Sequence, residues 1–152
     1  MPQYLDLYFL VNHRKANIIR NFFYDYSFEK KELAVDYPFP QYSEIVQYVF
    51  YSDLDLLSYM ENNVNGEYLI YWQNTNADLD IYQFTLQYTS DGSMIVGISF
   101  PCQEIARERS IELFFEFKKY FNATAGYITR EVPPPETALE FLEFCKARFS
   151  PD

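Results

Sequence analysis

The sequence predicts a single α+β domain, a sandwich in which a mainly antiparallel sheet is covered by helices on one face. Apolar side chains recur at every second position in several segments, as in half-buried strands, and these segments come in runs rather than alternating strictly with helices. Asp91-Gly92 separates two such segments, and this dipeptide is typical of tight hairpin turns. The length of 152 residues fits one domain, which buries roughly 70% of the surface of its unfolded chain. We therefore expect one domain over residues 1–152.

In the first half of the chain, period-two alternation predicts strands and three- or four-residue spacing predicts helices. Asn12 and Ser52 are suitable N-caps, and Asp55 suits the first turn that follows Ser52. Pro38 ends a strand because it has no N–H group to donate. The expected elements are a strand at 3–11, a helix at 13–26, strands at 33–37 and 45–51, a helix at 53–62 and a central strand at 67–73. For 45–51 a helix is the alternative.

The second half begins with the clearest local signal, two alternating segments on either side of Asp91-Gly92. Pro133-Pro134-Pro135 predicts a stiff, extended connector, and Thr137 with Glu140 forms a capping box for a last helix. The expected elements are hairpin strands at 82–89 and 94–100, a helix at 104–121, a short edge strand at 127–131 and a helix after Thr137. The resulting order is β-α-β-β-α-β-β-β-α-β-α.

The composition is that of a folded domain in a reducing compartment. Hydrophobic residues make up 49% of the chain and aromatic residues 20%, with fifteen Tyr and fifteen Phe, which excludes intrinsic disorder. Cys102 and Cys145 lack the spacing of a disulfide framework; we expect reduced thiols, with Cys145 packed in the last helix and Cys102 more exposed. Residues 1–10 have no basic segment, and apolar stretches fall short of the roughly 20 residues that span a bilayer. We therefore expect a cytoplasmic protein.

Catalytic and cofactor-binding patterns are weak. The one histidine, His13, stands at the expected start of a helix beside Arg14 and Lys15, where we expect a solvated terminal residue. Carboxylates at i and i+2 occur at 53/55 and 78/80, but the further ligands of a calcium loop are missing. With four glycines, no phosphate-binding loop can be assembled. We predict no enzyme activity, no metal and no cofactor.

Charge is divided sharply along the chain. Residues 32–106 contain eleven carboxylates and no Lys or Arg, whereas the two ends together hold eleven acids and twelve bases. The centre therefore accounts for the net charge of −10. Such a distribution disfavours nucleic acid as a ligand, because binding requires Lys and Arg at the phosphates. Solubility is one explanation of the acidity, and recognition of a basic partner is the other.

For a recognition face we expect carboxylates interleaved with aromatic rings, because the acids would attract a basic partner and the rings would hold it. The candidate partner-binding residues are Asp53, Asp55, Glu61, Glu67, Tyr71, Trp72, Asp78, Asp80 and Tyr82.

Three stretches resemble segments of the small acidic α+β immunity proteins of bacterial polymorphic toxin systems. They are EYLIYWQN (67–74), YTSDGSMIVGISF (88–100) and REVPPPETALEF (130–141), and the resemblance spans roughly the C-terminal half of the chain. It implies a protein that neutralises a toxin by binding it, and it carries over no individual binding residue.

Our first hypothesis is a non-catalytic protein that neutralises or regulates a basic protein, such as a toxin nuclease, by covering its active cleft. A small-molecule-binding module or degenerate enzyme with an aromatic-lined pocket is the alternative. A homodimer that buries its exposed aromatic residues is a third reading.

Overall fold

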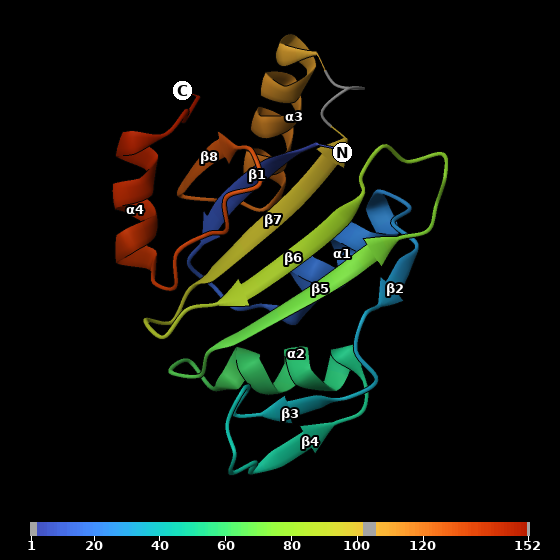
Figure 1. Ribbon diagram of the computed structural model, residues 1–152, viewed down its shortest axis with the longest axis vertical. Coiled ribbons are helices and arrows are strands. Elements are labelled where there is room, and N and C mark those ends of the chain that lie inside the picture. The colour runs from blue at the N-terminus through green and yellow to red at the C-terminus, as the bar shows by residue number, and fades with distance from the viewer. Residues whose placement is uncertain (1–2, 102–105, 152) are drawn as a thin grey trace.

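The computed structural model describes residues 3–101 and 106–151, and these form a sheet with helices on both faces (Figure 1). All pairings within the six-stranded sheet are antiparallel, which confirms the predicted α+β class. In spatial order its strands are β2 (Lys30–Glu32), β5 (Tyr68–Asn74), β6 (Gln83–Tyr88), β7 (Met94–Pro101), β1 (Tyr4–Val11) and β8 (Ala125–Thr129). The helices are α1 (Ala16–Asp25), α2 (Asp53–Asn62), α3 (Arg107–Tyr120) and α4 (Ala138–Ala147). None of these helices is both long and apolar enough to cross a bilayer.

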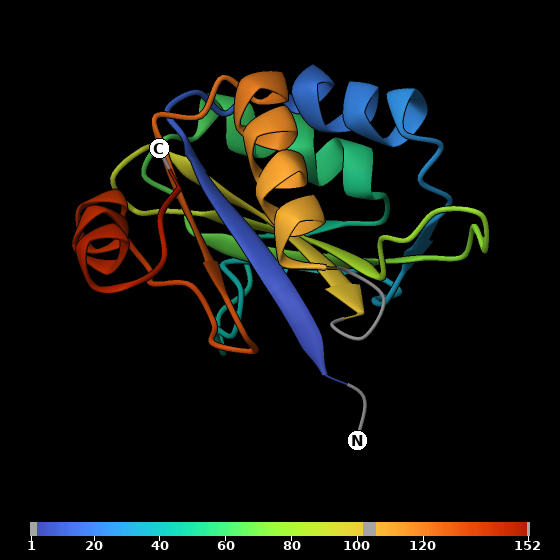
Figure 2. The same cartoon turned by 90° about the horizontal axis from the view of Figure 1, so that it is seen from above.

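The main core lies between the sheet and helices α1, α2 and α3, which Figure 2 shows on the same side of the strands. Alternate residues of β1, β5, β6 and β7 point into it, as period-two patterning requires. Phe22 of α1 stands near its centre, with ring centroids 5.0 Å from Phe84 of β6 and 5.9 Å from Phe117 of α3. Aromatic packing of this kind explains where many of the phenylalanines are used.

The fourth helix packs on the opposite face of the sheet, which differs from the expectation that the helices cover one face only. Phe141 of α4 is fully buried in a second, smaller cluster with Tyr8 of β1, Ile95 of β7 and Tyr127 of β8. Cys145 packs against the same cluster, as expected, whereas Cys102 lies outside the described residues. Because α4 sits over the β1–β8 side, the same face of β5 and β6 carries no helix (Figure 1).

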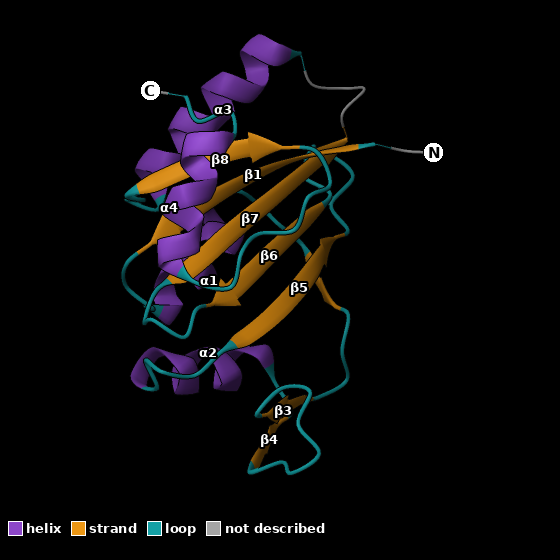
Figure 3. Cartoon of the chain, turned by 60° about the vertical axis from the view of Figure 1, so that its left-hand side comes forward, coloured by secondary structure: helices purple, strands orange, loops and turns teal. Residues whose placement is uncertain are grey.

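Two short strands form a lobe of their own below the sheet (Figure 3). They are β3 (Tyr37–Phe39) and β4 (Tyr48–Phe50), which pair antiparallel. The strand expected at 33–37 is therefore wrong, and that at 45–51 is shorter than expected. The sheet strand β2 lies earlier, where Lys30 pairs with Asn74, and lysine suits a short edge strand. Leu33 and Val35, which suggested a strand, are 54% and 93% exposed.

Local capping signals succeed where the capping partner is near in sequence. Helix α2 begins at Asp53 as predicted, and the Ser52 side chain accepts from the Asp55 N–H. Thr137 likewise caps α4 by accepting from the Glu140 N–H. Helix α1 differs, because it begins three residues later than predicted and its first N–H, at Ala16, donates to Glu61 Oε1 at 2.6 Å rather than to Asn12.

The turn between β6 and β7 also fixes the position of α4. Asp91 in this turn accepts hydrogen bonds from the Ala138 N–H, 3.0 Å from each carboxylate oxygen, and from the Leu139 N–H. Gly92 follows with φ of +90°, a conformation that favours glycine. Burial would raise the pKa of Asp91, but the side chain of Thr89 and the backbone N–H donors together outweigh it, so the pKa is lowered. The predicted Asp-Gly turn is thus confirmed, with a second role in fixing the last helix.

Candidate functional site

Three adjoining hollows follow β5 and the helix-free face of the sheet. The first, the Glu67 hollow, has a volume of about 190 Å³. The second, the Leu33 hollow, measures about 280 Å³ and shares Gln41, Tyr42 and other lining residues with the first. The third, the Asp6 hollow, measures about 300 Å³ and shares Tyr71 with the second. We call the residues that line these three hollows the tyrosine face.

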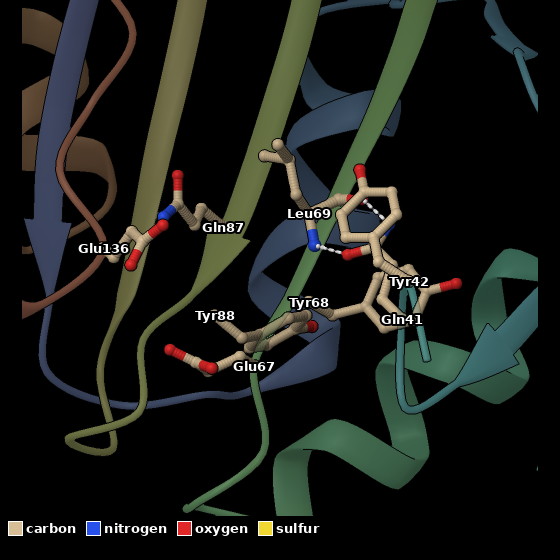
Figure 4. A pocket seen from close by; sticks show the side chains of 8 residues that line it. All are labelled: Gln41, Tyr42, Glu67, Tyr68, Leu69, Gln87, Tyr88 and Glu136. Atoms are coloured by element: carbon tan, nitrogen blue, oxygen red, sulfur yellow. Dashed lines mark hydrogen bonds between the residues drawn. The ribbon is translucent and has the colours of Figure 1, made fainter. Parts of the chain in front are cut away.

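The Glu67 hollow lies between the β3–β4 lobe and the connector that precedes α4 (Figure 4). Glu67 at the start of β5 and Glu136 from the connector both line it. Gln87 of β6 holds the connector in place, because its side-chain Nε2 donates to the carbonyl of Pro135 at 3.0 Å. Two carboxylates from distant parts of the chain thus share one hollow.

Gln41 closes part of the open edge of β5. Strand β2 ends opposite Trp72, so the first half of β5 has no neighbouring strand on that side. The Gln41 amide takes that place: its Nε2 donates to the Leu69 carbonyl and its Oε1 accepts from the Leu69 N–H, both at 2.8 Å (Figure 4). One side chain therefore reproduces the hydrogen bonds of a strand residue and attaches the lobe to the sheet.

Removing this side-chain amide should loosen the lobe. We expect Gln41→Ala to lower the free energy of unfolding by about 1–2 kcal/mol, because two hydrogen bonds to a sheet edge are lost. Limited proteolysis should then cut residues 40–47 faster than in the wild type. Gln47→Ala is the control, since Gln47 lies in the same lobe and its side chain is exposed. Equal proteolysis rates for the two variants would contradict the role given to Gln41.

The Leu33 hollow is mostly apolar and borders an exposed apolar surface on the lobe. Asp36 supplies its carboxylate, and Tyr37 and Tyr42 supply rings. Tyr42 and Ile45 in the loop of the lobe are 86% and 80% exposed, and Val35, just before β3, is 93% exposed. Contiguous exposed apolar patches are a feature of interaction surfaces, and these three side chains lie close together in the sequence.

The Asp6 hollow contains a buried carboxylate. Asp6 of β1 is 6% exposed; its Oδ1 accepts from Ser99 Oγ at 2.5 Å and its Oδ2 from the Glu131 N–H at 2.9 Å. Burial raises the pKa of Asp6 above its ordinary value. The rings of Tyr4 and Tyr82 stack beside it, with centroids 4.5 Å apart.

Tyr8 forms another wall of the Asp6 hollow and lies over Gly97. A Cβ atom at Gly97 would stand 2.6 Å from the Tyr8 ring, so glycine leaves the room that the ring occupies. Burial raises the pKa of Tyr8 and Tyr71, and raises that of Tyr68 to about 12. These phenols therefore stay neutral at physiological pH and offer rings and hydroxyl groups rather than charge.

The tyrosine face carries acids without bases. Among the described residues that line it are eight tyrosines, five carboxylates and no Lys or Arg. The carboxylates are Asp6, Asp36, Glu67, Glu131 and Glu136, and the tyrosines are Tyr4, Tyr8, Tyr37, Tyr42, Tyr68, Tyr71, Tyr82 and Tyr88. Three of these rings, Tyr37, Tyr68 and Tyr88, belong to the main core and are at most 4% exposed. A hollowed, low-dielectric surface of one sign focuses the field on a partner of the opposite sign.

Of the candidate residues predicted from the sequence, three lie on the tyrosine face: Glu67, Tyr71 and Tyr82. Asp53 and Trp72 do not, and their prediction as contact residues is corrected. Asp53 is 3% exposed and accepts from Lys30 Nζ at 2.5 Å and from Trp72 Nε1 at 2.8 Å. Trp72 itself is fully buried. Both side chains belong to the interior, where they join β2, α2 and β5.

The remaining acids are dispersed. Glu61 caps α1, and Asp55 is exposed at the start of α2. Asp78 and Asp80 are exposed beyond the end of β5, a full strand away from Glu67 at its start. The expectation of one surface made by all nine residues is therefore wrong. Most acids of residues 32–106 nevertheless lack an ion-pair partner from the two ends of the chain. Within the described residues, Lys30–Asp53 is the one ion pair that joins an end to this central part.

Sequence reasoning missed four carboxylates of the tyrosine face, and three of them lie outside the acidic centre. These three are Asp6, Glu131 and Glu136, whereas Asp36 belongs to the centre. The alternation of β1 does place Asp6 on the face opposite Leu5 and Leu7, which is a usable signal. No comparable pattern in the sequence places Glu131 and Glu136 over the sheet.

Comparison of the chain with protein-family models, with curated proteins and with solved structures gave no match. Within residues 3–101 and 106–151, no three His, Cys, Asp or Glu side chains gather as metal ligands would. The arrangement on the tyrosine face is thus one of hydrogen-bond acceptors, rings and negative charge.

Proposed function

We propose that this is a non-catalytic binding protein whose tyrosine face recognises a basic protein. The observation that carries the proposal is the series of three hollows lined by five carboxylates and eight tyrosines, with no base among their described lining residues. Tyrosine provides large contact area at a low cost in conformational entropy, and complementary charge speeds association and selects the partner.

The size and nature of the surface favour a protein over a small molecule. The hollows are open and adjoin one another, and the β3–β4 lobe beside them exposes apolar side chains, Tyr51 at 78% among them. A small ligand would leave most of this surface in water, whereas a protein interface of standard size covers about 800 Å² on each partner. The mostly apolar Leu33 hollow is the feature that favours the alternative, a small-molecule-binding module.

The resemblance of three segments to immunity proteins suggests what the partner is. A toxin nuclease has a positively charged active cleft because it binds phosphates, and an acidic face would cover that cleft. Neutralisation by occlusion needs no catalytic group on this chain. The cytoplasm is where such a protein would meet a toxin that has entered or is being made.

Two variants with the same change in charge test the role of the face. One removes three of its carboxylates (Asp36→Asn, Glu67→Gln, Glu136→Gln), and the matched control removes three exposed acids elsewhere (Asp55→Asn, Asp78→Asn, Asp80→Asn). Partners captured from the source cells by the wild-type protein are identified by mass spectrometry, and their affinities for each variant are then measured with purified proteins. We expect basic partners, at least a roughly tenfold loss for the face variant, about 1.4 kcal/mol, and little loss for the control.

Salt dependence provides the second readout. The association rate of the wild type should fall as ionic strength rises, because charges are screened beyond about 8 Å at physiological salt. The face variant should show a shallower dependence than the control. Acidic partners, or equal losses for both triple variants, would refute recognition through the tyrosine face.

A further inference from the structure

We propose that the Asp6 hollow is a receptor site for a single arginine side chain, whose guanidinium lies between Asp6 and the surrounding tyrosine rings. The source of that arginine, a basic partner, rests on the proposed function. The site itself is defined by its own residues and can be tested without any partner.

The first observation is a buried carboxylate with no cation beside it. Asp6 is 6% exposed, and within the described residues no Lys or Arg forms an ion pair with it. Burying a charge without a counter-charge is costly, and such groups concentrate at functional sites. An incoming cation would relieve that cost. Asp6 nevertheless faces a hollow that a ligand can enter, since it lines the hollow along with Thr85 and Ser99.

The second observation is the free hydrogen-bonding capacity of this carboxylate. An ionised carboxylate accepts at about four lone-pair positions, and Asp6 uses one on each oxygen, for Ser99 Oγ and for the Glu131 N–H. Each oxygen therefore keeps acceptor capacity on its other side. A guanidinium donates two parallel N–H groups and matches two such oxygens, whereas an ammonium group acts as a point charge.

The third observation is the ring arrangement. Tyr4 and Tyr82 are stacked with an interplanar angle of 19°, and Tyr8 and Tyr71 line the same hollow. A planar guanidinium stacks on aromatic faces and is attracted to them, and it is less strongly hydrated than an ammonium group. The rings thus favour arginine over lysine.

The backbone at Glu131 is held in an unusual conformation at the border of this hollow. Its φ is +54°, which a residue with a side chain seldom adopts, and in this conformation its N–H points at Asp6. Glu131 also lines the hollow and adds a second carboxylate. Backbone conformations of this kind cluster at ligand sites, and here it orients the Asp6 carboxylate.

The test uses the purified full chain and two probes of equal shape. Nα-acetyl-arginine methylamide carries the guanidinium, and the corresponding citrulline derivative carries an uncharged urea group in its place. Backbone amide shifts are followed by NMR during titration with each probe. We expect saturable shifts at Asp6, Thr85, Ser99 and Glu131 with the arginine probe, and at least a tenfold weaker response to citrulline.

Two variants test whether the arginine probe binds to Asp6 and to the surrounding tyrosine rings. Asp6→Asn keeps the size of the side chain but removes the charge: its amide oxygen still accepts from the Glu131 N–H, and its NH2 group donates to Ser99 Oγ in place of accepting from it. Arginine binding should therefore fall at least tenfold. Tyr82→Leu removes the ring at a half-buried position and should weaken binding while leaving Asp6 in place. Asp78→Asn, an exposed carboxylate outside the hollow, should bind as the wild type does.

Equal binding of the two probes, unchanged binding by Asp6→Asn, or the absence of saturable shifts at the hollow would overturn the arginine site. In that case Asp6 serves only to hold the chain after β8. These results are separable from the proposed function: a basic partner that binds while the arginine probe does not refutes the arginine site alone. An arginine probe that binds when no basic partner is captured refutes the proposed function alone.

Discussion

Replacement of Asp53 by alanine should lower the free energy of unfolding by about 2–4 kcal/mol. The carboxylate is the common acceptor for the ammonium group of Lys30 on β2 and the indole N–H of Trp72 on β5. Alanine would leave a buried indole N–H without an acceptor and the partly exposed Lys30 without its counter-charge, and each of these losses is costly. Because Asp53 is also the first residue of α2, three elements would lose a common attachment.

Urea unfolding followed by Trp72 fluorescence measures this loss directly, since Trp72 is the one tryptophan of the chain. Asp53→Asn keeps an acceptor for the indole and should fall between alanine and the wild type. Asp55→Ala, in the same helical turn but exposed, should cost less than about 1 kcal/mol, which is the range for an acid near a helix N-terminus. Equal losses for Asp53→Ala and Asp55→Ala would contradict the interior role of Asp53.

Replacement of Arg14 by methionine should cost about 3 kcal/mol. Arg14 is 4% exposed and donates to the backbone carbonyls of Asn63 (2.7 Å), Met60 (3.5 Å) and Thr89. Its guanidinium also lies 5.2 Å from the centre of the Tyr88 ring. Methionine fills much of the volume but donates no hydrogen bond, so buried carbonyls at the end of α2 and of β6 lose their donor.

Chemical denaturation of Arg14→Met, Arg14→Lys and Lys15→Met separates charge from geometry. Lysine keeps the charge but lacks the two separate NH2 groups with which Arg14 reaches these carbonyls, so it should be intermediate. Lys15 is adjacent in sequence and exposed, and its replacement should change stability by less than about 0.5 kcal/mol. Full stability of Arg14→Met would show that water or another donor satisfies these carbonyls.

The parts of the fold that sequence alone predicts are those whose determinants are local. The Asp91-Gly92 hairpin, the Ser52 cap of α2 and the Thr137 cap of α4 each involve residues within a few positions of one another. The start of α1 and the place of β2 depend on partners about 45 positions away, Glu61 and Asn74. Periodicity carries no information about such partners, and both predictions failed for that reason.

The residues of the candidate site also divide into those that local sequence can place and those that it cannot. Asp53 and Asp55 are the same residue type two positions apart, and only the packing of α2 decides that one is buried and the other exposed. Trp72 shares the phase of Tyr68 and Ile70 along β5, so the alternation could have placed it in the core. Of the five carboxylates on the tyrosine face, sequence reasoning named only Glu67, because Asp6, Glu131 and Glu136 come from the near-neutral ends.

The connector between β8 and α4 is fixed at three points: the Glu131 N–H on Asp6, the Pro135 carbonyl on Gln87, and the Ala138 N–H on Asp91. Its run of prolines further restricts the backbone before folding. One wall of the tyrosine face is consequently preorganised, and a partner that docks against it need not bear the entropic cost of ordering a mobile loop.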